Sequence, residues 1–250
     1  MKTRVAAIYD IHGNLPALEA VLEEIRHERV DEIVVGGDVL PGPMPRETLE
    51  CLLDLGLPVR FIRGNGDRVV LGAMRGSEPA EVPVQFREQI HWNARQLTGA
   101  HEKVLANWPQ MNRMEIDGLG AVLFCHATPR NDTDVFTRVT PEKSLLPLFQ
   151  NLDADLVVCG HTHMQFDRRV GTVRVVNAGS VGMPFGEPGA YWLLLGPDVQ
   201  LQRTSYDLAQ AADRIRATSN PQANEFADRN VVNPPFEAGM LEAFAKVPLP

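Results

Sequence analysis

Short hydrophobic runs along the chain end abruptly in clusters of polar residues, and this pattern predicts buried strands followed by loops. Most of these runs are rich in valine and isoleucine. They span Val5–Tyr9, Glu32–Val35, Val59–Ile62, Ala121–Cys125, Leu156–Cys159 and Val173–Val176. Brief hydrophobic runs with turn residues after them are typical of strands that are buried on both faces.

Helical spacing of hydrophobic residues appears between the early strands. Asn14 is a suitable N-cap and Pro16 suits a first turn, so we expect a helix to begin at this point. Its inward face would carry Leu15, Leu18, Val21, Leu22 and Ile25. A second helix is expected over Pro45–Leu55. This alternation of strand and helix predicts βαβ units at the N-terminal end.

Three later segments depart from this alternation, and all are assigned to one domain that spans residues 1–250. Residues 68–112 contain two expected helices, Val84–Leu97 and Gly99–Asn107, and are interpreted as a helical insertion. Residues 170–201 combine short strands with glycine-rich turns, which predicts a second and more antiparallel sheet. The tail from about residue 219 is rich in Asn and Pro. We expect it to pack loosely, with a short helix near Glu237–Lys246.

The composition disfavours membrane and nucleic-acid binding proteins. No stretch is long and apolar enough to span a bilayer, and the first hydrophobic run ends too soon for a signal peptide. A net charge of −8 opposes binding to a nucleic-acid backbone, so no strong nucleic-acid binding is expected. Cys51, Cys125 and Cys159 form no CxxC pair and are interpreted as free thiols of a cytoplasmic protein.

Side chains of metal-ligating type stand directly after five of the predicted strands. These candidate ligands are Asp10, His12, Asp38, Asn65, His126, His161 and His163. Open α/β sheets place their sites beyond the carboxyl ends of strands. A single residue of this kind is more often structural, but its recurrence at five strand ends favours a metal site. Mixed oxygen and nitrogen donors suit Mn²⁺, Fe²⁺ or Zn²⁺, and Asp38, isolated after two glycines, is suited to bridge two ions.

In this combination of motifs the sequence resembles the calcineurin-like metallophosphoesterases. The resemblance rests on Asp10-Ile-His12-Gly-Asn14, Gly37-Asp38, Gly64-Asn65, His126 and Gly160-His161-Thr-His163, in the family's order. Asn177-Ala-Gly-Ser180 is similar to the bacterial and archaeal phosphodiesterase branch.

The resemblance implies an α/β fold in which two mixed sheets pack as a sandwich flanked by helices. It also implies two metal ions and a division of the ligands between them. Asp10, His12 and His163 would bind one ion. Asn65, His126 and His161 would bind the other, with Asp38 between them.

One position departs from the family pattern. Many members carry a His directly after the Asn, and that His is thought to protonate the leaving group, whereas this chain has Gly66. The resemblance therefore implies a complete metal site without the usual general acid, and a preference for good leaving groups. His91 and His101 would replace that acid only if the insertion folded over the metals. Exposed helix positions are the favoured interpretation for both.

Two polar residues are candidates for substrate binding. Arg130 suits a bidentate contact with a phosphate, and the alternative is a salt bridge to Asp132 or Asp134. Asn14 either contacts substrate or only caps the helix that follows it. Asp67 is expected either to orient a metal ligand or to shape its own turn.

The function predicted from these residues is dinuclear metal-dependent hydrolysis of phosphodiester bonds through a metal-bridging hydroxide. The alternative is a non-catalytic scaffold of the same fold that acts through protein partners. A nucleotide-binding regulator is disfavoured, because Gly36-Gly-Asp38 lacks the spacing of known phosphate-binding glycine motifs. The expected partners are a small phosphorylated substrate, such as a nucleotide, and, in a homo-oligomer, a second copy of the chain.

Overall fold

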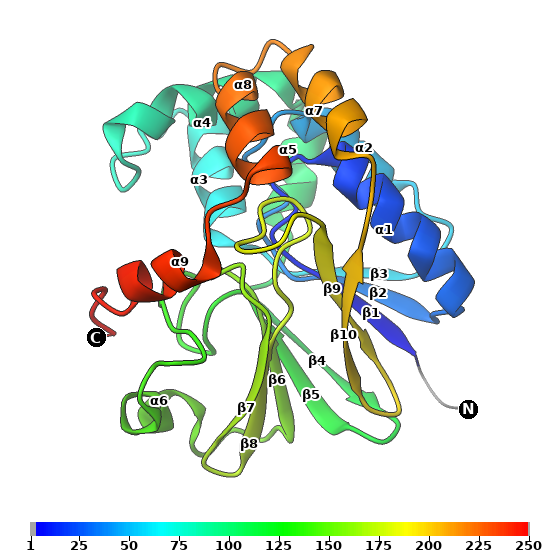
Figure 1. The fold of residues 1–250 in the computed structure, drawn as a ribbon, viewed down its shortest axis with the longest axis vertical. Coiled ribbons are helices and arrows are strands. Elements are labelled where there is room, and N and C mark those ends of the chain that lie inside the picture. Colours follow the sequence, from blue (N-terminus) through cyan, green and yellow to red (C-terminus); the bar gives the residue numbers. More distant parts are fainter. Residues whose placement is uncertain (1–3, 250) are drawn as a thin grey trace.

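The computed structural model describes residues 4–249, whose strands form two five-stranded sheets (Figure 1). The first sheet has the order β10-β9-β1-β2-β3 and the second has the order β4-β5-β6-β8-β7. The strands of the first sheet are β1 (Val5–Ile8), β2 (Glu32–Val35), β3 (Val59–Phe61), β9 (Ala190–Leu195) and β10 (Val199–Thr204). Those of the second are β4 (Met111–Ile116), β5 (Gly120–Cys125), β6 (Leu156–Cys159), β7 (Phe166–Val170) and β8 (Val173–Asn177).

Each sheet combines parallel and antiparallel pairs, as the resemblance implied. In the first sheet β1, β2 and β3 run parallel, while β9 is antiparallel to both β1 and β10. In the second sheet β5, β6 and β8 run parallel, while β4 and β7 are antiparallel edge strands. The predicted mixed α/β sandwich is therefore confirmed. Residues 1–3 and 250 of the expected single domain lie outside the described part of the chain.

Successive residues of the central strands point into different cores, which explains why these strands are continuous hydrophobic runs. In β1, Ala6 and Ile8 face the helices, while Val5 and Ala7 face the second sheet. The core between the sheets also contains Tyr9, Val34, Val122, Phe124, Val158, Leu193 and Leu195. Since both faces of these strands are covered, most positions along them are buried, and in β1 and β6 all of them are.

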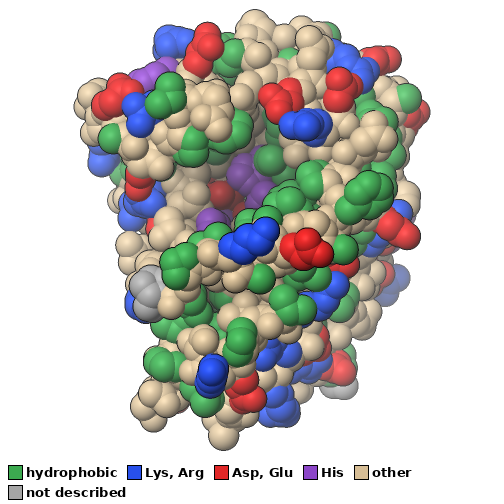
Figure 2. All heavy atoms as spheres, turned by 60° about the vertical axis from the view of Figure 1, so that its left-hand side comes forward, with side chains coloured by type: hydrophobic (Ala, Val, Ile, Leu, Met, Phe, Trp, Pro, Cys, Tyr) green, Lys and Arg blue, Asp and Glu red, His purple; other side chains and the backbone are tan. Residues whose placement is uncertain are grey.

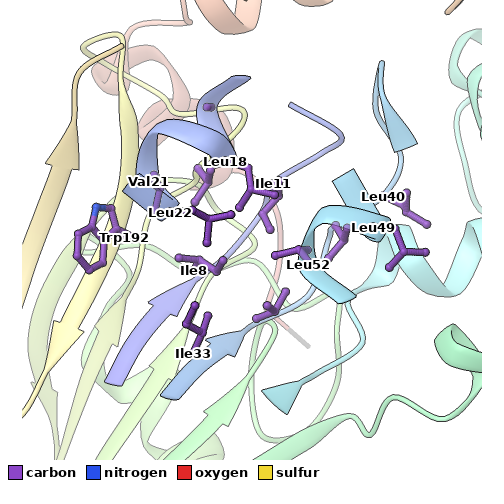
Figure 3. Packing of buried hydrophobic residues seen from close by; sticks show 14 of the residues in the cluster. Ile8, Ile11, Leu18, Val21, Leu22, Ile33, Leu40, Leu49, Leu52 and Trp192 are labelled. Atoms are coloured by element: carbon purple, nitrogen blue, oxygen red, sulfur yellow. The ribbon is translucent and has the colours of Figure 1, made fainter. Parts of the chain in front are cut away.

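Helices α1 (Leu15–Glu28) and α2 (Pro45–Leu53) cover the outer face of the first sheet. Leu18 and Leu22 of α1 lie over Ile8 and Ile33 of the strands (Figure 3). Fully burying one such aliphatic side chain stabilises the fold by about 1.5–3 kcal/mol before entropy is counted. On the other side of the molecule, α6 (Glu142–Phe149) covers the outer face of the second sheet.

The segment between β3 and β4 is helical, as the sequence predicted. It contains α3 (Asn65–Met74), α4 (Val84–Gln96) and α5 (Gly99–Ala106). The segment ends at β4, which the sequence did not reveal. Most β4 residues are at least partly exposed, because it is an edge strand, so it lacks a continuous hydrophobic run. No helix in the described part of the chain is both long and apolar enough to cross a membrane.

The expectation that residues 170–201 belong to a second, more antiparallel sheet holds for β7 and β8 but is wrong for β9 and β10. β7 and β8 form a hairpin in the second sheet, but β9 and β10 add to the first sheet beside β1. The physical reason is that β9 is hydrophobic on both faces. Trp192 and Leu194 pack under α1, whereas Leu193 and Leu195 fill the core between the sheets.

The expectation of a loosely packed tail is also wrong for residues 220–232. In this region α8 (Ala223–Phe226) continues into the π-helix η1 (Ala227–Val232), and both pack against α7 (Leu208–Arg216). Phe226 and Val231 are buried in this contact because small residues of α7 leave room for them. The expected terminal helix, α9 (Glu237–Phe244), has no buried residue.

Candidate metal centre

The loops after five strands bring all seven predicted ligands to one edge of the sandwich. Their ligand atoms form two clusters, Asp10–His12–His163 and Asp38–His126–His161, and within each cluster these atoms lie within 4.8 Å of one another. The Asn65 amide adjoins the second cluster, 3.1 Å from His126 Nε2 and 3.0 Å from His161 Nδ1.

The two clusters are neighbours, and carboxylate oxygens lie between them. Asp38 Oδ2 is 3.5 Å from His126 Nε2 of its own cluster and 3.8 Å from His12 Nε2 of the other. Asp10 Oδ1 is 3.4 Å from His163 Nε2 and 3.9 Å from His126 Nε2. This arrangement offers two adjacent cation positions that share a carboxylate.

Three of the four histidines have one ring nitrogen held by a backbone carbonyl. The Nδ1 atoms of His12, His126 and His163 lie 3.3, 3.0 and 2.7 Å from the carbonyl oxygens of Pro41, Gly36 and Met183. A neutral imidazole that donates from Nδ1 keeps its Nε2 lone pair free for a metal ion. Each of these three Nε2 atoms faces the centre. The Nε2 atoms of His12 and His163 lie only 3.3 Å apart.

Each of the two central carboxylates also has one oxygen held by the backbone. Asp10 Oδ2 accepts a hydrogen bond from the His161 backbone N–H at 2.8 Å, and Asp38 Oδ1 accepts one from the Gly66 N–H at 2.7 Å. Asp10 Oδ1 is buried, points into the centre and has no hydrogen-bond partner. A buried carboxylate oxygen without a partner is costly unless a cation compensates it. The donor set therefore fits a pair of divalent metal ions.

Charges in the centre depend strongly on one another. Burial opposes ionisation of Asp38, but the imidazoles of His126 and His12 outweigh it and hold the carboxyl pKa below its ordinary value. Burial also opposes the charge on His126, yet Asp38 and Asp10 raise its pKa to about 10. Burial, together with the charge on His126, lowers the pKa of His161 to about 4. At neutral pH the site therefore contains charged carboxylates and a neutral His161.

The backbone is left-handed at five of the seven candidate ligands. The φ angles are 52° at Asp10, 48° at His12, 51° at Asp38, 65° at His161 and 58° at His163. This conformation costs a residue other than glycine about 1–2 kcal/mol. It persists only where surrounding contacts fix it, and such residues cluster at functional sites.

Asp67 connects two of the ligand loops, which decides between its two predicted roles. Its carboxylate accepts hydrogen bonds from the backbone N–H groups of Asp38 at 2.8 Å, Leu40 at 3.0 Å and Gly64 at 3.0 Å. Burial and the nearby Asp38 charge raise its pKa to about 7. Asp67 therefore positions Asp38 from the start of α3 and does more than shape its own turn.

The Asn177–Ser180 motif supports the other loops from behind. Ser180 Oγ donates to the Asp10 carbonyl at 2.7 Å, and Asn177 Nδ2 donates to the Gly160 carbonyl at 2.6 Å. Both residues are fully buried. The motif thus orders the loops that carry Asp10 and His161.

Comparison with known proteins agrees with this geometry. A model of the calcineurin-like phosphoesterase superfamily domain matches residues 3–196. The chain belongs to this family. The matched segment contains every candidate ligand of the metal centre.

Several relatives of this family member come from archaea and bacteria. It is 27% identical over 243 residues to a Methanocaldococcus jannaschii protein named only as uncharacterized, covering 89% of this chain and 96% of that one. It is 28% identical over 195 residues to phosphodiesterase YfcE of Escherichia coli strain K12, covering 74% and 83%. Among solved structures, a Sphaerobacter thermophilus metallophosphoesterase has a TM-score of 0.72 at 27% identity, covering 92% and 98%. A Pyrococcus horikoshii protein reaches a TM-score of 0.78 at 22% identity, covering 90% and 97%.

Both residues predicted to contact substrate in this calcineurin-like protein form hydrogen bonds with other groups of the protein. Arg130 forms a bidentate ion pair with Asp134, at 3.0 Å from Nε and 2.6 Å from a terminal nitrogen, which matches the alternative prediction. Asn14 is fully buried. Its oxygen caps α1 by accepting from the Ala17 N–H at 3.2 Å, and its amide donates to the Gly182 carbonyl at 3.0 Å. The Asn14 side chain is thus committed to the fold and is unavailable to substrate.

A cavity of about 1170 Å³ opens over the metal centre. Figure 2 shows this face hollowed, with histidine side chains at the bottom and hydrophobic side chains on the border. Arg68 is one of its lining residues, and the sequence reasoning missed it. Its only sequence signal is the spacing of three residues from Asn65 on the first turn of α3. His91 and His101 do not line the cavity and instead lie 3.4 and 3.6 Å from Glu78 and Glu50.

Proposed function

We propose that this chain is a dinuclear metal-dependent phosphodiesterase. The observation that supports it best is the pair of adjacent ligand clusters with Asp38 Oδ2 between them. In the proposed assignment Asp10, His12 and His163 hold one ion. Asn65, His126 and His161 hold the second, and Asp38 bridges the two. The mixture of oxygen and nitrogen donors favours Mn²⁺, Fe²⁺ or Zn²⁺ over Ca²⁺.

The residues of the site would position the substrate phosphate between the clusters and the cavity. Bound divalent ions would lower the pKa of a coordinated water towards neutrality and neutralise charge on the phosphoryl oxygens. Arg68 lies about one helical turn from Asn65 and lines the same cavity, but Asp132 and Glu81 balance its charge, so the attraction for an anionic ester would come mainly from the bound ions. His12, Asp38 and Asn65 line the base of that cavity and would meet the phosphate first.

Two observations favour a diester with a good leaving group as the substrate. The position of the usual proton donor is Gly66, which has no side chain to protonate a poor leaving group. One of the relatives is the Escherichia coli protein named phosphodiesterase YfcE. The small phosphorylated substrate expected from the sequence would therefore be a diester whose leaving group is weakly basic and departs without a proton from the protein.

The experiment measures hydrolysis of bis(p-nitrophenyl) phosphate and p-nitrophenyl phosphate after removal and replacement of metal. We expect turnover with Mn²⁺, loss of turnover with a chelator, and a higher kcat/KM for the diester. Asp38→Asn should lower kcat/KM by more than about 100-fold, because losing a shared ligand costs more than losing an outer-shell partner. Asp153→Asn is the matched control, since Asp153 is a surface carboxylate paired with Arg113.

The same assay tests the rival function, a non-catalytic scaffold. That alternative is favoured by a single feature, the glycine at the general-acid position. A rate that is equal with Mn²⁺ and with chelator, in protein that binds Mn²⁺, would establish the scaffold and refute the enzyme. Unchanged turnover in Asp38→Asn would instead remove Asp38 from the site.

A further inference from the structure

The cavity continues well beyond the candidate ligands and changes character as it does so. His12, Asp38, Asn65 and Arg68 line one part of it. The other part is mainly hydrophobic, and we call it the distal pocket. Its hydrophobic residues include Val82, Phe86, Ile90, Phe226, Val232 and Pro234, and polar residues such as Gln89, Gln222 and Asn230 stand among them. They come from the helical insertion and from the C-terminal segment, two regions far apart in the sequence.

We infer that the distal pocket binds a bulky, uncharged hydrophobic ester group of the phosphodiester substrate. This inference rests on the proposed function and adds a substrate class to it. The cavity of about 1170 Å³ exceeds what a phosphate with a small alcohol requires. Pockets of roughly 300–1,000 Å³ already enclose ligands of drug size. Hydrophobic walls stabilise a bound apolar group by removing its surface from water.

Charges at the cavity lining argue against a second phosphate as the occupant. Among the described lining residues the cations are Arg68 and Arg229. Arg68 is paired with Asp132 and Glu81 at 2.7 Å each, and Arg229 is paired with Glu225 at 3.3 Å. Because acidic partners already neutralise both arginines, the pocket offers little attraction to a further anion.

Hydrogen bonds hold the two walls of the pocket in place. Gln222 Nε2 donates to the Gln85 carbonyl at 3.3 Å and joins the C-terminal segment directly to α4. Asn220 Nδ2 donates to the Gly42 carbonyl at 3.1 Å, at the loop after β2. A pocket whose walls are fixed before binding loses less conformational entropy when a ligand enters.

An unusual element forms part of the C-terminal wall. η1 is a π-helix, a rare conformation that is often found at functional sites. Ala227 and Val231 anchor it by packing in the cluster with α7, while Asn230 and Val232 line the cavity. One side of the π-helix therefore lines the cavity while its other side packs against α7.

The test compares the binding of benzylphosphonate and methylphosphonate to the Mn²⁺-loaded protein by calorimetry. Each probe carries one organic group, so the phosphonate at the metal centre leaves only that group to enter the distal pocket. We expect benzylphosphonate to bind about tenfold more tightly or better, as a hydrophobic pocket discriminates by added apolar bulk. Its binding should also show a more negative heat-capacity change.

Two variants assign the preference to the pocket. Phe86→Ala should lower the affinity for benzylphosphonate by about tenfold and change that for methylphosphonate much less. Phe86 is 41% exposed, so its truncation should not unfold the chain. Val232→Thr keeps the side-chain volume, adds a hydroxyl and should act in the same direction. Leu201→Ala removes an exposed hydrophobic residue of β10 that does not line the cavity, and should change neither affinity.

Different outcomes separate the failure of this inference from the failure of the proposed function. Equal affinities in the wild type, or equal weakening of both probes by Phe86→Ala, would overturn the pocket assignment even if bis(p-nitrophenyl) phosphate is hydrolysed. Selective binding of benzylphosphonate without any turnover of that diester would overturn the proposed function, and the pocket would then no longer be a substrate site.

Discussion

Asp38 and His126 couple the protonation of the site to metal binding at the scale of single residues. The carboxylate raises the pKa of the imidazole to about 10 from its ordinary 6.5, although burial acts in the opposite direction. In the metal-free protein His126 is therefore protonated at neutral pH. This shift stabilises the fold below pH 6.5, and the contribution is lost as the pH rises towards 10. A metal ion needs the neutral imidazole and must displace the proton.

Metal binding at pH 7 should therefore release a proton, and the affinity for Mn²⁺ should increase as the pH rises. Calorimetric titration of the metal-free protein with Mn²⁺ in two buffers of different ionisation enthalpy measures this release. We expect the wild type to release at least one proton per bound pair of ions and His126→Gln to release fewer. His27→Gln changes an exposed histidine and is the control. A binding heat that is the same in both buffers would show that His126 is already neutral.

At the scale of elements, the start of α3 is pressed against the loop after β2. A Cβ atom at Gly66 would lie 2.3 Å from the Leu40 carbonyl oxygen and 2.9 Å from Pro41 Cδ. The Gly66 N–H also donates to Asp38 at 2.7 Å, so the helix cannot withdraw without disturbing the centre. The missing general acid is thus a consequence of packing as well as of sequence.

Gly66→His should therefore fail to restore a general acid. We expect weaker Mn²⁺ binding and slower turnover, because overpacking of this kind costs about 1–3 kcal/mol and would displace Asp38. Gly72→Ala, in the same helix, is the matched control, since the nearest atom to its Cβ is 3.7 Å away. Metal content and kcat/KM of both variants give the answer. Faster hydrolysis of an ester with a poor leaving group by Gly66→His would contradict the packing argument.

The central elements and the convergence of the candidate ligands were predictable because they depend on local sequence. A strand buried on both faces is a continuous hydrophobic run, and His or Asp directly after it lies at a known edge of the sheet. The placement of β9 beside β1 was not predictable. A strand far along the chain can pair with any free sheet edge, and its local sequence does not say which edge it joins. Arg68 was missed in favour of Arg130 for a similar reason. Arg68 lines the cavity because of the way the helical insertion packs. Arg130 pairs with Asp134 because of the conformation of their shared loop. Neither arrangement can be inferred from the local sequence.

At the scale of the whole molecule, the centre draws its ligands from both sheets. Asp10, His12, Asp38 and Asn65 follow strands of the first sheet, and His126, His161 and His163 follow strands of the second. The sheets are already joined by a buried core in which the Tyr9 hydroxyl donates to the Val158 carbonyl at 3.1 Å. Bound ions would add a second connection between them at the edge where the loops meet.

Mn²⁺ should therefore stabilise the entire fold against unfolding. At a free concentration of 100 times Kd, the free energy of unfolding should rise by about 2.7 kcal/mol for a single site. Thermal unfolding at increasing Mn²⁺ concentrations measures the effect. Asp38→Asn should show a smaller increase at the same concentrations, while Asp153→Asn should behave as the wild type. A midpoint that does not move with Mn²⁺, in protein shown to bind the metal, would mean that the unfolded chain binds the ions as tightly as the folded one, so that binding does not require the two sheets to be joined.

The left-handed backbone at five of the candidate ligands has a consequence for how such a protein changes over generations. Glycine adopts this conformation without the penalty that Asp and His incur. Exchange of a ligand for glycine would remove chemistry and relax the loop in one step. Loss of activity would then be accompanied by a gain in folding stability, so an inactive descendant need not be an unstable protein.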